Sequence, residues 1–182
     1  MKKFTIYQMT ACAVMAALMC ILGPFSVPIG PVPISVTNLV IYVTVMILST
    51  KLSLTSYIIY LLLGIVGLPV FSGFQGGLSK IAGPTGGYLI GFILMIVICG
   101  IFVKKFREKP VFIGIGMFIA TLVAYAFGTV WFVIMMQCSL LYALTVCVFP
   151  FIPFDIAKIV IAIIVGSAIY RAMKKAGLVK YE

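Results

Sequence analysis

Asp155 and Lys158 are the residues of this chain whose types and spacing are best suited to chemistry. The 182 residues include only three acids, and of these Asp155 alone stands at the start of a strongly apolar segment. Lys158 follows three residues later, so on a helix the two side chains share one face. Ionisable groups inside apolar sequence are costly and usually face a cavity or a partner. The pair therefore indicates either a site for a polar ligand or an ion pair that only fixes the helix, and its spacing leaves both interpretations open.

The composition of the chain shows what must surround that pair. Hydrophobic residues make up 64% of the sequence, charged residues only 9%, and the mean hydropathy is +1.32. A soluble domain of this size could not cover its surface with so few polar residues. We expect an all-α integral membrane protein that forms a single domain over residues 1–182, with the lipid bilayer as its solvent.

Apolar runs of the length that a bilayer requires predict six transmembrane helices. The expected spans are at about residues 4–23, 34–48, 52–66, 84–103, 111–135 and 153–170. Four prolines between residues 24 and 33 exclude a continuous helix there. Residues 137–150 are too short for a further crossing and are interpreted as an interfacial or re-entrant helix.

The distribution of cations orients these spans. With both termini cytoplasmic, eleven of the thirteen cations fall on the cytoplasmic side, as the positive-inside rule requires. They are Lys2, Lys3, Lys51, Lys104, Lys105, Arg107, Lys109, Arg171, Lys174, Lys175 and Lys180. Because they lie at the ends of apolar runs, the net charge of +10 indicates a membrane topology rather than nucleic-acid binding.

Prolines also mark the outer ends of three predicted spans, at Pro31 or Pro33, Pro84 and Pro153. Proline suits the first turn of a helix, whose free N–H groups carry a partial positive charge. If these three helix starts meet, they favour an anionic ligand such as a carboxylate.

The sequence gives little support to an enzyme or a metal site. Histidine is absent, the five cysteines are spread through apolar runs, and no acid pair or nucleophile with a visible base occurs. An intramembrane enzyme is thus the weaker alternative to a binding protein, and no cofactor or metal is expected.

A glycine-rich loop over residues 67–83 is the second candidate region. Gly73, Gly76 and Gly77 permit tight turns, so the loop can fold back over a cavity, with Phe71, Phe74 and Gln75 as its wall. Packing against lipid is the alternative for the two phenylalanines. Lys80 follows Ser79 rather than a glycine, so the loop is not a phosphate-binding P-loop. Gly83, Gly87 and Gly91 recur every four residues and predict close packing of another helix.

Several blocks of the sequence resemble the BioY family, the biotin-binding S-components of energy-coupling-factor (ECF) transporters. The matching blocks are Gly67-Leu68-Pro69-Val70-Phe71, Gly83-Pro84-Thr85-Gly86-Gly87-Tyr88-Leu89, residues 28–34 and the segment 149–158. They occur in the family's order over most of the chain. One departure is Asn38, because the family often carries glutamine shortly after the block at 28–34.

The resemblance implies a six-helix S-component that captures biotin with high affinity for uptake. Asp155 and Lys158 match the family's acidic and basic positions, and Lys80 is a second candidate for the biotin carboxylate. Phe71, Phe74 and Tyr88 would contact the apolar part of biotin.

The resemblance also implies the partners and the location of the chain. Because the chain has no ATPase motif of its own, a transmembrane coupling protein and two cytoplasmic ATPases would supply the energy, in the plasma membrane of a prokaryote. The family's coupling-protein contact matches Ala13 and Ala17, whose spacing equally suits ordinary internal packing. An S-component for a different vitamin is the nearest alternative.

Overall fold

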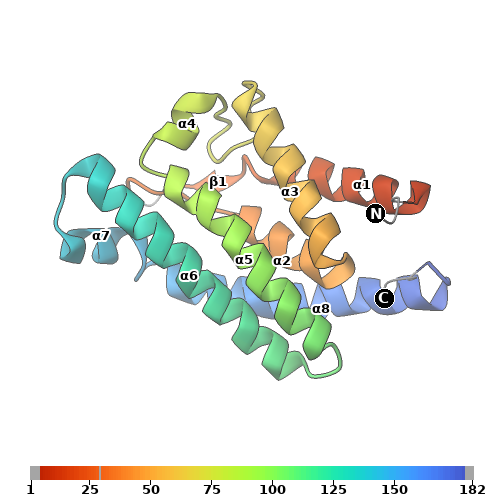
Figure 1. Ribbon diagram of the computed structural model, residues 1–182. Coiled ribbons are helices and arrows are strands. Elements are labelled where there is room, and N and C mark those ends of the chain that lie inside the picture. The colour runs from red at the N-terminus through yellow and green to blue at the C-terminus, as the bar shows by residue number, and fades with distance from the viewer. Residues whose placement is uncertain (1–4, 29, 179–182) are drawn as a thin grey trace.

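The computed structural model describes residues 5–28 and 30–178, which form a helical bundle with one small β-hairpin (Figure 1). The start of the first predicted span at Phe4, residue Ile29, and the cations Lys2, Lys3 and Lys180 lie outside the described residues. The elements are α1 (Ile6–Leu22), β1 (Ser26–Val27), β2 (Ile34–Ser35), α2 (Thr37–Ile47), α3 (Thr50–Ile65), α4 (Leu78–Ala82), α5 (Gly86–Lys105), α6 (Pro110–Met136), α7 (Leu140–Cys147) and α8 (Phe151–Lys175).

The six predicted spans correspond to α1, α2, α3, α5, α6 and α8, with ends that differ by a few residues. By length and apolar composition, α5, α6 and α8 can each cross a membrane, whereas α1, α2 and α3 are shorter apolar helices. The 11 residues of α2 cover about 16 Å, roughly half of the hydrocarbon layer. Six full crossings and cytoplasmic termini therefore stay predictions. The interval 137–150 contains α7, a separate eight-residue helix.

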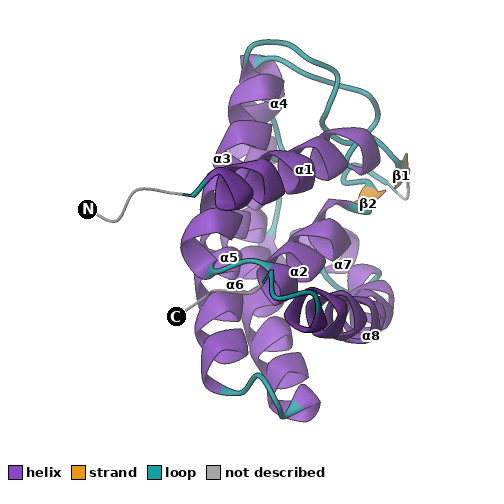
Figure 2. Ribbon diagram, turned by 90° about the vertical axis from the view of Figure 1, so that its right-hand side faces the viewer, coloured by secondary structure: helices purple, strands orange, loops and turns teal. Residues whose placement is uncertain are grey.

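Small residues allow the long helices to approach closely. A Cβ atom on Gly87 would lie 2.2 Å from the Cβ of Trp131, and one on Gly91 would lie 3.2 Å from the Cα of Ala124. Two of the three glycines of the predicted stripe thus face α6, which runs beside α5 (Figure 1). Gly83 precedes the helix. Figure 2 shows α8 crossing beside α2, where Gly166 lies against the side chain of Met46.

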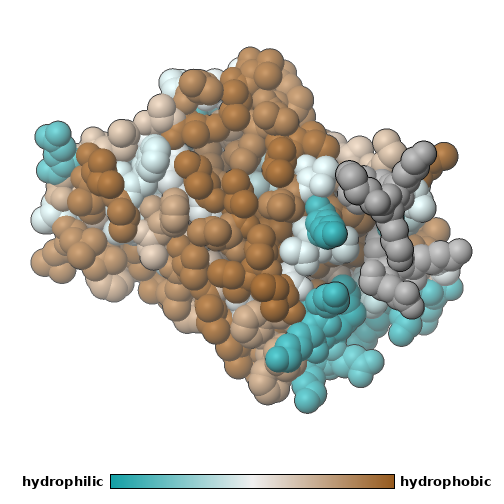
Figure 3. Space-filling view, viewed as in Figure 1, coloured by the Kyte–Doolittle hydropathy of each residue, from teal (hydrophilic) through white to brown (hydrophobic). Residues whose placement is uncertain are grey.

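The face of the molecule shown in Figure 3 is strongly hydrophobic, and polar residues gather on it near the junction of α5 and α6 and near the end of α8. Lys104 and Lys105 close α5, and Lys174 and Lys175 close α8. Arg107 joins the two ends, because its guanidinium carbon lies 3.8 Å from the ring centroid of Tyr170. Most of the described basic residues are therefore at one end of the bundle, in keeping with the predicted orientation.

Two local features differ from the sequence-based expectation. Residues 24–35 include a hairpin in which Ser26 pairs with Ser35 and Val27 with Ile34. The short helix α4 interrupts the glycine-rich loop. Apolar periodicity does not reveal elements of two to five residues, because their conformation depends on tertiary contacts.

Proline marks the helix starts less closely than predicted. Helix α2 begins at Thr37, after β2, so neither Pro31 nor Pro33 begins it. Helix α5 begins two residues after Pro84, and α8 begins at Phe151 with Pro153 inside its first turn. The expectation of a proline at the start of each helix therefore holds only for α8.

Candidate ligand-binding site

One cavity is enclosed by the starts of α2, α5 and α8 together with α3, α4, α6 and the glycine-rich loop. The start of α2 contributes Thr37 and Asn38, the start of α5 contributes Thr85, and the start of α8 contributes Phe151. The meeting of helix starts predicted from the sequence is thus present in the structure, although proline does not define each start. Free N–H groups at helix starts favour negatively charged groups nearby.

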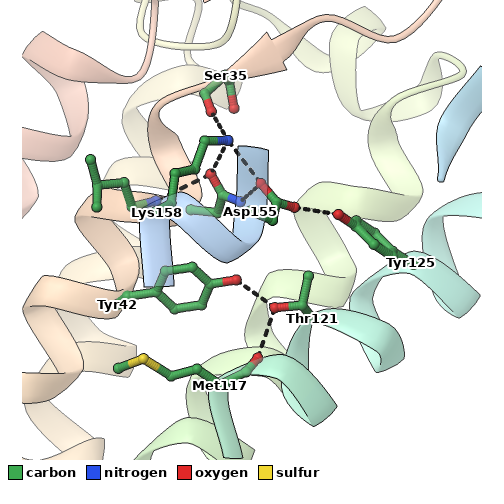
Figure 4. Close-up of polar contacts among 9 residues, drawn as sticks. Ser35, Tyr42, Met117, Thr121, Tyr125, Asp155 and Lys158 are labelled. Carbon is green, nitrogen blue, oxygen red and sulfur yellow. Dashed lines mark hydrogen bonds and ion pairs between the residues drawn. The ribbon is translucent and has the colours of Figure 1, made fainter. Parts of the chain in front are cut away.

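Asp155 lines this cavity and is almost fully buried, with 4% of its surface exposed. Its Oδ1 accepts hydrogen bonds from Asn38 Nδ2 at 2.8 Å and from Lys158 Nζ at 2.9 Å. Its Oδ2 accepts one from the Tyr125 hydroxyl at 2.5 Å (Figure 4). An ionised carboxylate has about four acceptor positions. Oδ2 therefore has acceptor capacity left for a donor in the cavity.

Lys158 is held by the same group of residues. Its Nζ donates to the Ser35 carbonyl oxygen at 2.8 Å, to Asn38 Oδ1 at 3.0 Å and to Asp155 Oδ1 (Figure 4). An ammonium group has three N–H donors, so all of them are used. The pair is thus an ion pair that links α8 to the start of α2, and it also lines the cavity. The ion pair predicted from the spacing is thus confirmed, and the ligand-binding role of the two residues stays a prediction.

Asn38, Tyr125 and Ser35 complete this network, and sequence reasoning assigned none of them to the site. Asn38 was noted only as a departure from a motif, yet its amide donates to Asp155 and accepts from Lys158. Tyr125 lies in the middle of an apolar helix with no local motif around it. Ser35 contributes its backbone carbonyl oxygen, which no sequence pattern marks.

The glycine-rich loop covers the cavity with Phe71. This ring is fully buried and meets the ring of Tyr60 edge to face, with 5.5 Å between the ring centroids. Backbone hydrogen bonds in both directions join Phe71 and Gln75 across a tight turn. Gly73 and Gly77 have positive φ values of 76° and 92°, as the turn prediction requires. The N–H of Gly73 donates to the Pro24 carbonyl oxygen at 2.9 Å and so fastens the loop to the first connection.

Phe74 is placed differently from the predicted cavity wall. Its side chain is 61% exposed and packs edge to face on Phe25, away from the residues that line the cavity. A positive φ of 56° at Phe74 turns the backbone at this point. Gln75 also lies outside the cavity lining, on a second hollow that it shares with Ser79, Lys80 and other residues of the loop.

Lys80 borders both the cavity and this second hollow. Its Nζ donates to Gln75 Oε1 at 2.7 Å. Within the described part of the chain it forms no ion pair with an acid. Partial burial lowers the pKa of Lys80 from its ordinary value, because the charged form is less well solvated.

Two tyrosines complete the apolar walls. The Tyr88 ring fills the space beside Gly128, and its hydroxyl donates to the Cys147 carbonyl oxygen at 3.1 Å. The Tyr60 hydroxyl is fully buried and has no hydrogen-bond partner among the described residues. A buried polar group without a partner is rare in a native protein. The Tyr60 side chain lines the cavity, and we predict that a bound ligand supplies a partner for its hydroxyl.

The fold and the cavity together define a helical membrane protein that encloses a space lined by both apolar and polar residues. The BioY family matches residues 1–175. The chain therefore belongs to the BioY family.

Individual relatives agree with this assignment. The chain is 32% identical over 175 residues to the biotin transporter BioY2 of Lactococcus lactis subsp. cremoris. The aligned region covers 95% of each chain. It is 33% identical over 161 residues to the biotin transporter BioY of Thermotoga maritima, over 87% of this chain and 93% of the relative.

A solved structure confirms the fold. The crystal structure of the S-component for biotin from an ECF-type ABC transporter superimposes with a TM-score of 0.86 and 28% sequence identity, over 93% of this chain and 95% of the other. The all-α membrane fold of an S-component is thus confirmed, and so is the interpretation as a transport subunit rather than an enzyme.

Proposed function

We propose that this chain is the high-affinity biotin-binding subunit of a vitamin uptake system. The observation that carries the proposal is the cavity in which a buried, hydrogen-bonded carboxylate faces apolar walls. Membership of a family whose named members are biotin transporters identifies the ligand.

The chemistry of biotin suits the two kinds of surface in this cavity. Its ureido ring carries two N–H donors, and Asp155 Oδ2 has room to accept one in addition to the Tyr125 hydroxyl. Hydrogen bonds to an ionised acceptor are stronger than neutral ones. The thioether ring and alkyl chain of biotin are apolar and pack against Phe71, Tyr88 and Phe92, which line the same space.

Energy for transport comes from partners in this proposal, namely a transmembrane coupling protein and two cytoplasmic ATPases. Ala13 and Ala17 are both exposed on α1, whereas the neighbouring Cys12 and Ala16 are buried. Two small exposed residues four apart let another helix approach closely. We assign this face of α1 to the coupling protein, and the chain to the plasma membrane of a prokaryote as a six-span protein with cytoplasmic termini.

Isothermal titration of the purified, detergent-solubilised chain with biotin tests the function, with thiamine and riboflavin as control ligands. One-to-one binding of biotin alone is the expected result. Binding of another vitamin in place of biotin would assign the chain to a different substrate, and no binding by a folded sample would refute the proposal.

The partner surface has a separate test. Ala13→Leu and Ala17→Leu should reduce co-purification with the coupling protein and leave biotin affinity unchanged. Ala168→Leu is the matched control, because Ala168 is an exposed alanine on α8. Equal co-purification of all three variants would remove this face of α1 from the interface.

A further inference from the structure

The two lysines that line the cavity differ in how many of their donors are free. Lys158 uses its three N–H groups on Ser35, Asn38 and Asp155. Lys80 has one hydrogen bond within the described part of the chain, to Gln75 Oε1. Since an ammonium group carries three donors, Lys80 keeps two for a ligand.

Lys80 on α4 and Asp155 on α8 line the cavity from elements on opposite sides of the bundle (Figures 1 and 2), and these two ends of the cavity differ in charge. At the first end, Lys158 and Asp155 form an ion pair with 2.9 Å between Nζ and Oδ1, so their charges cancel. At the second end, the charge of Lys80 has no acidic counterpart among the described residues. A neutral group that donates hydrogen bonds fits the first end, and an anion fits the second.

We propose that Lys80 is the anion-binding residue of this cavity: a ligand places its carboxylate on Lys80 and its neutral, hydrogen-bonding head on Asp155. The inference rests on the proposed function and deepens it, because it fixes which lysine meets the biotin carboxylate. Lys158 then has the different task of neutralising and positioning Asp155.

The placement of Lys80 suits a residue that receives a ligand. It lies on the five-residue helix α4 within the glycine-rich loop, shortly before the start of α5, and is partly exposed. Its single partner, Gln75, is a neutral amide on the exposed part of the same loop. A carboxylate is a stronger acceptor for an ammonium group than an amide oxygen, so an acidic ligand can add to this contact or displace it.

The proposal predicts that the chain binds acids more tightly than their neutral analogues, and that this preference depends on the side chain of Lys80. Biotin and biotin amide share the ureido ring, thioether ring and alkyl chain, and differ only at the terminal group. The wild-type chain should bind biotin about tenfold or more tightly than biotin amide, the effect of one charge-assisted contact.

Titrations of both ligands against a set of lysine variants test the proposal. Lys80→Met should lower the ratio of biotin to biotin amide affinity to about one, with little change in the affinity for the amide, whereas Lys80→Arg should keep the preference. Lys158→Met should weaken both ligands alike and leave the ratio unchanged. Lys104→Met removes an exposed charge at the other end of the bundle and serves as the control.

A preference that survives in Lys80→Met, or that disappears in Lys158→Met instead, would overturn this inference while biotin binding itself still stands. A folded wild-type chain that binds neither ligand would overturn the proposed function and this inference with it.

Discussion

The two ends of the cavity show two different ways of presenting a charged side chain. At the Asp155 end, the carboxylate, the lysine and the bridging amide of Asn38 are hydrogen-bonded to one another and come from the helices α2 and α8. At the Lys80 end, a lysine on a short helix has one contact to a loop glutamine. The first end is hydrogen-bonded within the protein, and in our proposal a ligand completes the second.

This difference follows from how firmly each end is supported. Tyr125 and Lys158 reach Asp155 from helices of 27 and 25 residues whose backbones pack along the bundle. The loop before Lys80 turns through glycines at 73 and 77, and backbone hydrogen bonds from Gly73 to Pro24 and from Gly77 to Gly64 join it to the rest of the protein. Rigid groups give orientation to a bound ligand, whereas a group on a loop can adjust to it.

The largest expected effect comes from Asp155→Asn. The variant removes the charged acceptor and leaves Lys158 without its counter-charge, so biotin binding should weaken by about 1.5–3 kcal/mol, the range of a charge-assisted hydrogen bond. Titration calorimetry measures this loss, with Glu108→Gln as the control at the far loop. Unchanged affinity in a folded Asp155→Asn sample would remove Asp155 from the site.

Asn38→Leu should have the next largest effect. Asp155 loses one donor and Lys158 one acceptor, and each such bond to a charged group is worth about 1.5 kcal/mol or more. Biotin affinity and the thermal midpoint of the ligand-free protein should both fall. A stable variant with wild-type affinity would show that the amide does not organise this end.

Tyr60→Phe and Tyr57→Phe form a matched pair with opposite expectations. Removing the unpartnered hydroxyl of Tyr60 should leave the ligand-free thermal midpoint unchanged or raised, and should weaken biotin binding by about 1 kcal/mol. Tyr57 donates to the Leu89 carbonyl oxygen at 2.7 Å, so its loss should lower the midpoint instead. Equal behaviour of the two variants would mean that the Tyr60 hydroxyl has no ligand partner.

The smallest effect is a pH dependence that belongs to the Lys80 end alone. Burial lowers the pKa of free Lys80, and a bound carboxylate would raise it again. Biotin affinity should therefore be highest below the pKa of free Lys80 and should fall as the pH rises through it. Titration of biotin amide should show no such fall, and neither should titration of biotin against Lys80→Met. A fall of equal size for both ligands would contradict the assignment of the effect to Lys80.

Much of the fold could be predicted because it depends on local properties of the chain. Long apolar runs are sufficient to locate α5, α6 and α8, and the three-residue spacing is sufficient to place Asp155 and Lys158 on one face. The network around them was not predictable in the same way. Asn38 and Ser35 lie more than a hundred residues from their partners in α8, so only the packing of α2 on α8 brings them together.

The glycine-rich loop shows the same limit on a smaller scale. Its glycines correctly predicted a turn, but not which aromatic ring would face the cavity. Phe71 is buried over Tyr60, whereas Phe74 is turned outward at a residue with positive φ. A difference of three residues in a loop decides between cavity and surface, and no periodicity fixes it there.

A structure of the chain with biotin bound would test the central claim most directly. The account predicts the ureido ring beside Asp155 and Tyr125, the carboxylate within hydrogen-bond distance of Lys80, and Lys158 still bonded to Ser35 and Asn38. Biotin bound in the opposite direction, with its carboxylate on Lys158 and its ureido ring near Lys80, would contradict the account.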